Sequence, residues 1–289
     1  ADVLLLLNTR FSEVAAQNYT LVDIPSPKQR LIHIYSAAEE LGKLYAPTIG
    51  IQADPISLMS CLASYKAKAV MQRQEHITDC HASYLAWSRL PEREYPGTLQ
   101  MPHIMRALQT MLPTDSIITN GAGNYASWIH RFWSFRSYGS QLAPTSGSMG
   151  YGLPAAIAGK LACPDRTVVC IAGDGCFQMT MQELASAVQA QVQIIIIVVD
   201  NGIYGTIRMH QEKRFPKRVS GTDMVNPNFA ELAKAYGIFS ARITHHDDFA
   251  PALQQALHAE GPALLHLVLD KEVSTPLQTL TEISAGKSG

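Results

Sequence analysis

The sequence of 289 residues has little that would suit a nucleic acid, a membrane or a secretion signal. Its net charge is −1 and no block of like charge occurs, so it offers no concentrated basic face for nucleic acid or lipid. The longest purely aliphatic run, from Ile194 to Val199, is far too short to span a bilayer. The amino terminus lacks the basic segment of a signal peptide. We therefore expect neither a nucleic-acid nor a membrane partner.

Disulfide and zinc frameworks are missing as well. The five cysteines are scattered and form neither a C-x-x-C pair nor a zinc-ligand spacing. Such a set is typical of reduced thiols, which predicts a cytoplasmic protein. Apolar residues make up 47 % and charged residues 16 % of the chain, so there is ample material for a buried core and no case for disorder.

What the sequence does contain is a regular alternation of apolar runs and helical patterns. This alternation predicts parallel βαβ units and the α/β class. Residues 1–64 form a small α/β unit in this interpretation, and residues 65–98 form a polar, helix-prone linker with a Pro- and charge-rich end. Residues 99–289 are predicted to form a doubly wound parallel sheet. Within them, Thr180 and Glu183 predict a capping box, and Asn226-Pro227 predicts the start of a helix.

Two polar residues follow neighbouring strands of this predicted sheet. Asp174 comes after the strand at 167–172, and Asn201 comes after the strand at 194–199. The carboxyl ends of parallel strands face one crevice, where ligands bind. A carboxylate and an amide oxygen there suit a Mg²⁺ ion that also needs phosphate oxygens. Gly-Asp-Gly alone is more often a plain turn, but Asn201 at the next strand end favours a metal site.

The main competing signal is the segment 121–126, which fits the G-x-G-x-x-A outline of a dinucleotide site. Such a site also requires an acidic residue about 20 positions later, at the end of the next strand. The segment 140–145 contains none. We therefore interpret the glycine loop as a set of backbone donors for a diphosphate, with a nicotinamide-dependent enzyme as the weaker alternative.

These motifs together resemble those of a known family. Gly173-Asp174-Gly175, then a helix, then an apolar strand that ends in Asp200-Asn201-Gly202 resembles the thiamine-diphosphate motif, which normally runs from Gly-Asp-Gly to Asn-Asn. The segment from Ser146 to Ala156 is similar to the one that precedes this motif in acetolactate synthases. Residues 1–64 are similar to the second half of that family's central domain. The chain is thus identified as a member of the acetolactate synthase-like, thiamine-diphosphate-dependent family, which implies a thiamine-diphosphate-binding fold preceded by a partial α/β central domain.

The resemblance implies specific roles for residues of this sequence. The side chains of Asp174 and Asn201 and the carbonyl of Ile203 would bind Mg²⁺. The residues implied to hold the diphosphate, beside Gly173 of the motif, are Asn124, Tyr125, Gly175 and Cys176. Two residues are implied to assist catalysis: the Gly147 carbonyl would accept a hydrogen bond from the aminopyrimidine, and Met149 would be the wedge that bends the cofactor.

The implied reaction is decarboxylation of a 2-oxo acid with transfer of the acyl anion to an acceptor, in a homodimer or homotetramer. A 2-oxo acid decarboxylase, an oxidase, an acyl-CoA lyase and a non-catalytic relic that only binds the cofactor remain alternatives, and binding of FAD is left open. The family's activating glutamate belongs to a pyrimidine-binding domain with no counterpart here. The resemblance therefore implies that the chain alone is inactive.

Two positions depart from the family pattern. Asp200 replaces the first Asn of the usual pair; it could tighten Mg²⁺ binding or cap a turn, and we favour the turn. His210 stands where biosynthetic acetolactate synthases usually carry a Trp that selects the second substrate, so it is the candidate substrate residue. The basic stretch 213–218 that follows is read as a solvated lid rather than as a site for a carboxylate or coenzyme A.

Overall fold

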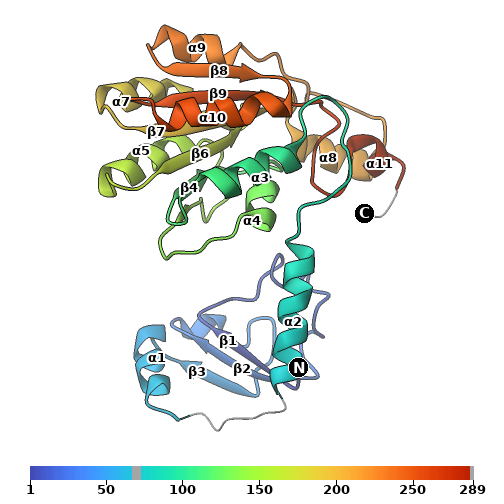
Figure 1. The fold of residues 1–289 in the computed structure, drawn as a ribbon. Coiled ribbons are helices and arrows are strands. Elements are labelled where there is room, and N and C mark those ends of the chain that lie inside the picture. Colours follow the sequence, from blue (N-terminus) through green and yellow to red (C-terminus); the bar gives the residue numbers. More distant parts are fainter. Residues whose placement is uncertain (67–72, 287–289) are drawn as a thin grey trace. The chain divides into compact units, whose positions relative to one another are not determined.

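The computed structural model describes residues 1–66 and 73–286, and these divide into two compact units, Ala1–Thr78 and Asp79–Gly289 (Figure 1). The division falls inside the predicted linker 65–98. The described part of that linker is largely helix α2, Arg73–Trp87, whereas its residues 67–72 lie outside the described residues. The proposed domain bounds of 1–64 and 99–289 stay predictions.

The first unit is a small parallel α/β arrangement. Its strands β1 (Val3–Leu7), β2 (Arg30–Tyr35) and β3 (Ile49–Gln52) are parallel and neighbour one another in chain order. The 3₁₀ turn η1 (Ala38–Glu40) and helix α1 (Pro55–Ala63) complete it. Leu6, Leu31 and Tyr45 pack together as a small core of its own.

The second unit is built on a sheet of six parallel strands in the order β5-β4-β6-β7-β9-β8. The strands are β4 (Ile117–Asn120), β5 (Gln141–Leu142), β6 (Val168–Gly173), β7 (Ile194–Asp200), β8 (Phe239–Ile243) and β9 (Ala263–Val268). The helical segments are α3 (Met101–Met111), α4 (Ala126–Phe132), α5 (Gly152–Ala162), α6 (Asp174–Gln178), η2 (Met181–Glu183), α7 (Leu184–Gln189), α8 (Gly205–Arg214), α9 (Phe229–Ala235), η3 (His246–Asp248), α10 (Phe249–Leu257) and α11 (Leu280–Ser284). The structure confirms the α/β class and the doubly wound parallel sheet.

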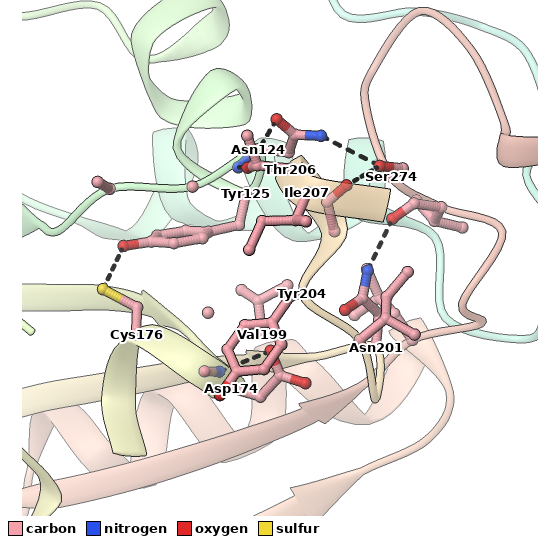
Figure 2. A pocket seen from close by; sticks show the side chains of 18 of the residues that line it. Asn124, Tyr125, Asp174, Cys176, Val199, Asn201, Tyr204, Thr206, Ile207 and Ser274 are labelled. Atoms are coloured by element: carbon pink, nitrogen blue, oxygen red, sulfur yellow. Dashed lines mark hydrogen bonds between the residues drawn. The ribbon is translucent and has the colours of Figure 1, made fainter. Parts of the chain in front are cut away.

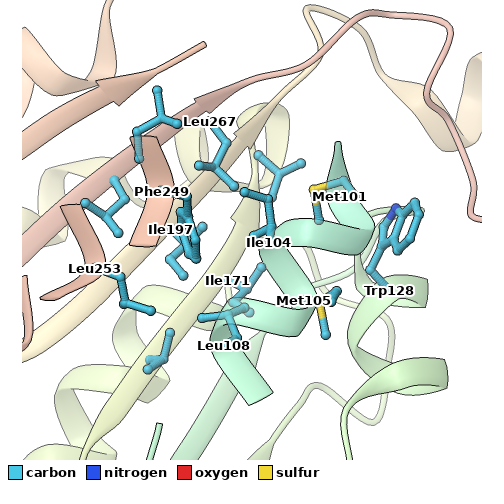
Figure 3. Packing of buried hydrophobic residues seen from close by; sticks show 14 of the residues in the cluster. Met101, Ile104, Met105, Leu108, Trp128, Ile171, Ile197, Phe249, Leu253 and Leu267 are labelled. Carbon is cyan, nitrogen blue, oxygen red and sulfur yellow. The ribbon is translucent and has the colours of Figure 1, made fainter. Parts of the chain in front are cut away.

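Each face of this sheet carries its own core, because successive strand residues point to opposite faces. On one face, alternate residues of β6, β7 and β9 pack against α3, α4 and α10, as Figure 3 shows for Ile104, Leu108, Trp128, Ile171, Ile197, Phe249, Leu253 and Leu267. On the other face the remaining strand residues pack against α5, α6, α7 and α9, and the members include Leu153, Cys170, Phe177, Leu184, Ile196 and Phe229. Burial on both faces explains why β7 reads as an unbroken aliphatic run.

The strand order opens a crevice at one edge of this sheet. β4 lies between β5 and β6, so the order of the strands reverses there. The segment after β4 leads to α4 on one face, and the segment after β6 leads to α6 and α7 on the other. Such a switch point leaves a crevice at the carboxyl ends of the strands, where ligands bind in open α/β sheets.

Four local features differ from the sequence prediction. The predicted capping box at Thr180 is wrong: its hydroxyl makes no cap and instead donates to the Gly150 carbonyl at 2.8 Å. A capping box does form at Thr279 and Glu282, which the sequence reading missed. Helix α9 begins after Asn228, whose side chain caps it, rather than at Asn226-Pro227. The two-residue strand β5 was also missed.

In residues 1–66 and 73–286, no helix combines the length and the apolar character needed to cross a bilayer.

Candidate functional site

A pocket lies at the carboxyl ends of β4, β6 and β7, and the segment after β9 contributes Val273 and Ser274 to its wall (Figure 2). It collects nine of the ten residues predicted for the cofactor: Asn124, Tyr125, Met149, Gly173, Asp174, Gly175, Cys176, Asn201 and Ile203. The tenth, Gly147, lines an adjoining cavity of about 580 Å³ that shares Ala122, Gly123 and Asn124 with the first. Residues from five separate segments therefore meet at the expected edge of the sheet.

Asp174 is the buried carboxylate of this pocket, with only 4 % of its surface exposed. It follows β6 directly, and its Oδ1 accepts a hydrogen bond from the Gly175 amide at 2.8 Å. Its Oδ2 accepts from the Gly202 amide at 2.9 Å and from Asn226 Nδ2 at 2.7 Å. Burial raises the pKa of Asp174 to about 6, although the hydrogen bonds from Gly175 and Asn226 oppose that shift.

Asp200, the residue that departs from the family pattern, ends β7 beside Asp174. Its Oδ1 accepts from the amide of Gly202, two residues later, at 3.0 Å, so it caps the turn as the sequence reading favoured. The same oxygen accepts from Asn226 Nδ2 at 2.7 Å, and Oδ2 accepts from His266 Nε2 at 2.8 Å. Burial works to raise the pKa of Asp200, but the hydrogen bonds from His266 and Asn226 outweigh burial and lower it.

The oxygens that surround this corner of the pocket suit a hard divalent cation. The amide nitrogen of Asn201 donates to the Val273 carbonyl at 3.4 Å, which leaves its side-chain oxygen for a ligand. Asp174, Asn201 and Ile203 all line the pocket. One carboxylate, one amide oxygen and one backbone carbonyl form the kind of partial oxygen shell that Mg²⁺ completes with phosphate oxygens and water. The residues present therefore fit the metal that the sequence predicts.

Asn124 lies across the pocket from Asp174 and connects the loops there through hydrogen bonds (Figure 2). Its backbone amide donates to Thr206 Oγ1 at 3.0 Å, and the Thr206 hydroxyl donates back to Asn124 Oδ1 at 3.0 Å. Its Nδ2 donates to Ser274 Oγ at 3.1 Å. The segments after β4, β7 and β9 are thus joined at one side chain.

Tyr125 and Cys176 meet at the floor of the pocket. The Tyr125 hydroxyl donates to Cys176 Sγ at 3.3 Å and accepts from the Gly121 amide at 3.0 Å. Cys176 Sγ also accepts from the Gly150 amide at 3.1 Å. Burial raises the pKa of Tyr125, so this phenol stays protonated and acts as a donor.

The remaining predicted residues lie at different distances from this centre. Met149 lines the pocket with 39 % of its surface exposed. His210 lies on α8 with an exposed side chain and lines neither of these two cavities, so the structure does not bring it to the site. On the same helix, Met209 lines the larger cavity and Ile207 the smaller one.

Sequence reasoning missed several residues around the site. Thr206 and Ser274 carry no motif, and their roles depend on a loop contact that only folding creates. Asn226 did carry a signal, since Asn-Pro is unusual, but that signal was interpreted as a helix start. His266 was hidden in the apolar strand β9, where a polar residue with 2 % exposure should have suggested a buried partner.

Comparison with known proteins identifies the family. The family described as "Thiamine pyrophosphate enzyme, C-terminal TPP binding domain" matches residues 121–267, about half of the chain. This chain belongs to the thiamine pyrophosphate enzymes. The matched range runs from the glycine loop after β4 to β9, and so it contains all ten residues predicted for the cofactor.

The relatives of this thiamine pyrophosphate enzyme include several acetolactate synthases. Acetolactate synthase isozyme 2 large subunit of Escherichia coli is 29 % identical over 93 % of this chain and 48 % of its own length. Mitochondrial acetolactate synthase of Schizosaccharomyces pombe is 31 % identical over 94 % of this chain and 43 % of its own length. The acetolactate synthase large subunit of Corynebacterium glutamicum is 30 % identical over 100 % of this chain and 46 % of its own length. The chain therefore spans about half the length of these relatives and is similar to them throughout.

Proposed function

We propose that this chain is the part of an acetolactate synthase-like enzyme that binds Mg²⁺ and the diphosphate of thiamine diphosphate. The observation that carries the proposal is the meeting of Asp174, Asn201 and Ile203 in one pocket, where a carboxylate, a side-chain amide and a backbone carbonyl would supply oxygen ligands. In the proposed site these three hold the metal. The backbone after β6 and the loop after β4 hold the diphosphate, through Gly173, Gly175, Cys176, Asn124 and Tyr125.

The proposed reaction is decarboxylation of a 2-oxo acid followed by transfer of the acyl unit to an acceptor. Thiamine diphosphate, when bound, supplies the electron sink for decarboxylation. The protein's part is positioning: Met149 would support a bent cofactor, and the Gly147 carbonyl would accept a hydrogen bond from its aminopyrimidine. Asn124 lines both cavities, whereas Met149 lines the smaller one and Gly147 the larger one, which supports their proposed places along one extended ligand.

The proposed assembly is a homodimer or homotetramer. Its activity would also need a region equivalent to the part of the relatives that this chain does not match. Names of the relatives support the reaction, since each is called an acetolactate synthase. Native mass spectrometry tests the assembly, and a purely monomeric protein at micromolar concentration contradicts it.

A binding titration tests the site itself. Trp128 lines the pocket, so its fluorescence can report thiamine diphosphate added with Mg²⁺ or with EDTA. We expect binding with Mg²⁺ and its loss in EDTA. Asp174→Ala should weaken the Mg²⁺-dependent binding by about 100-fold or more, because even a residue that only orients a metal ligand contributes about 10- to 100-fold.

Asp165→Ala is the matched control. This exposed aspartate precedes the amino end of β6, whereas Asp174 follows its carboxyl end. Its removal should leave the affinity unchanged. Equal affinity in Mg²⁺ and EDTA, or equal losses in the two variants, would contradict the proposed site.

A further inference from the structure

Asn226 lies between the two carboxylates at the ends of β6 and β7. Its Nδ2 donates to Asp174 Oδ2 and to Asp200 Oδ1, each at 2.7 Å. Its side-chain oxygen accepts from Gln178 Nε2 at 2.6 Å. The amide is therefore held at both ends, and its orientation is fixed by the two acids on one side and by Gln178 on the other.

These bonds decide which oxygen of Asp174 remains open. A carboxylate oxygen has two lone-pair sites, and Oδ2 uses both, one for the Gly202 amide and one for Asn226. Among the residues that the structure describes, Oδ1 accepts from the Gly175 amide alone and keeps one site. Asp174 thus offers a single lone pair to a cation and is set up to coordinate through one oxygen.

Asp200 is the second acceptor of the Asn226 amide nitrogen. Its Oδ1 is filled by Gly202 and Asn226, and its Oδ2 is held by His266 on the neighbouring strand β9. The His266 ring is buried, and Asp200 is absent from the lining of the pocket. Asp200 therefore anchors Asn226 rather than reaching a metal.

We propose that Asn226 is a positioning residue that keeps Asp174 in one-oxygen coordination and thereby favours Mg²⁺ over Ca²⁺ at this site. Mg²⁺ demands near-ideal octahedral geometry, which the narrow bite of a two-oxygen carboxylate disturbs. Ca²⁺ is larger and accepts carboxylates through one oxygen or two. Freeing Oδ2 of Asp174 therefore helps Ca²⁺ more than Mg²⁺. The inference rests on the proposed function, which supplies the metal.

The test compares two metals in one variant. Binding of thiamine diphosphate to the wild type and to Asn226→Ala is followed by tryptophan fluorescence, once with Mg²⁺ and once with Ca²⁺. We expect the Mg²⁺-supported affinity to fall about 10- to 100-fold, as is usual for residues that orient metal ligands. The Ca²⁺-supported affinity should fall less, so that the Mg²⁺-to-Ca²⁺ ratio drops by about tenfold.

Gln193→Ala is the matched control, because it removes an amide side chain immediately before β7, at the end of the strand opposite Asp200. Its Nε2 donates to the carbonyls of Leu257 and Ala259 rather than to the acids, so its loss should leave the ratio unchanged. Gln178→Ala is the second variant in case Asn226→Ala does not fold, and it should shift the ratio in the same direction by loosening Asn226.

The outcomes separate the inference from the function on which it rests. A wild type that binds thiamine diphosphate with neither metal overturns both. A wild type that binds, together with an Asn226→Ala variant that loses equal affinity in the two metals, overturns the inference alone. An equal shift of the ratio in Gln193→Ala also overturns it, because the effect would then follow from the loss of any amide side chain and not from the contacts of Asn226.

Discussion

Gly150, which follows the pocket residue Met149, shows how a residue without a side chain can hold a loop in place. Its φ is +85°, and an added Cβ would lie 2.9 Å from Met179 Cβ and from Thr180 Cγ2. Its amide donates to Cys176, and its carbonyl accepts from Thr180. The backbone before α5 is thereby held against α6 and η2. Both the backbone angle and the lack of space require glycine here.

Gly150→Ala should lower the free energy of unfolding by roughly 2–5 kcal/mol. About 1–2 kcal/mol comes from the left-handed backbone and about 1–3 kcal/mol from overpacking. Gly139→Ala is the control, since its φ is +64° but no atom lies within 4 Å of an added Cβ. It should lose only about 1–2 kcal/mol. Urea unfolding of both variants measures the difference, and equal losses would show that the contact with Met179 and Thr180 relaxes freely.

Helices on both faces of the sheet hold the strand ends in place. α3 and α10 cover one face, and α5 and α9 cover the other. The strands that carry Asp174 and Asn201 lie between these layers, and β7 pairs with both β6 and β9 along most of its length. The geometry of the pocket therefore depends on packing that occurs well away from it.

Leu253→Ala, on α10, should lower the free energy of unfolding by about 2–5 kcal/mol, because its side chain is fully buried and its removal leaves a cavity. Leu161→Ala, on α5, makes the same chemical change in a helix but at a side chain that is 61 % exposed. It should change stability by less than about 0.5 kcal/mol. Chemical denaturation compares the two, and similar losses would contradict the assignment of α10 to the core.

At the scale of the whole molecule, the chain consists of two units with separate cores. Separate cores are the structural condition for separate unfolding. All residues of the candidate site belong to the unit Asp79–Gly289. A ligand that binds there stabilises that unit by mass action.

Calorimetry should accordingly show two transitions, of which thiamine diphosphate with Mg²⁺ raises only one. At a ligand concentration of about 100 times the dissociation constant, the gain is about 2.7 kcal/mol. For a unit of this size that corresponds to a rise of roughly 5–10 °C. Asp174→Ala should abolish the rise. One cooperative transition, or two that move together, would show that the units unfold as one.

The sequence by itself determined the class of the fold and the edge of the sheet where the site lies. Alternating apolar runs and helical patterns indicated the parallel strands, because a strand that is buried on both faces is made mostly of apolar residues. Asp174 and Asn201 could be placed together from the sequence because strand ends in a parallel sheet share one edge. The motif residues can be recognised from short stretches of sequence that follow the strands. Nine of them line one pocket for this reason.

Tertiary structure alone decided how those residues are oriented. Asn226 and His266 lie 52 residues after Asp174 and 66 residues after Asp200, respectively, and no local pattern relates such distant positions. The same holds for Thr206 and Ser274, which reach Asn124 across 82 and 150 residues. His210 lies on α8 with an exposed side chain, and its role at the substrate stays a prediction. Sequence order specifies which strand end a residue follows, whereas hydrogen bonds between separate loops form only once the sheet has brought those loops together.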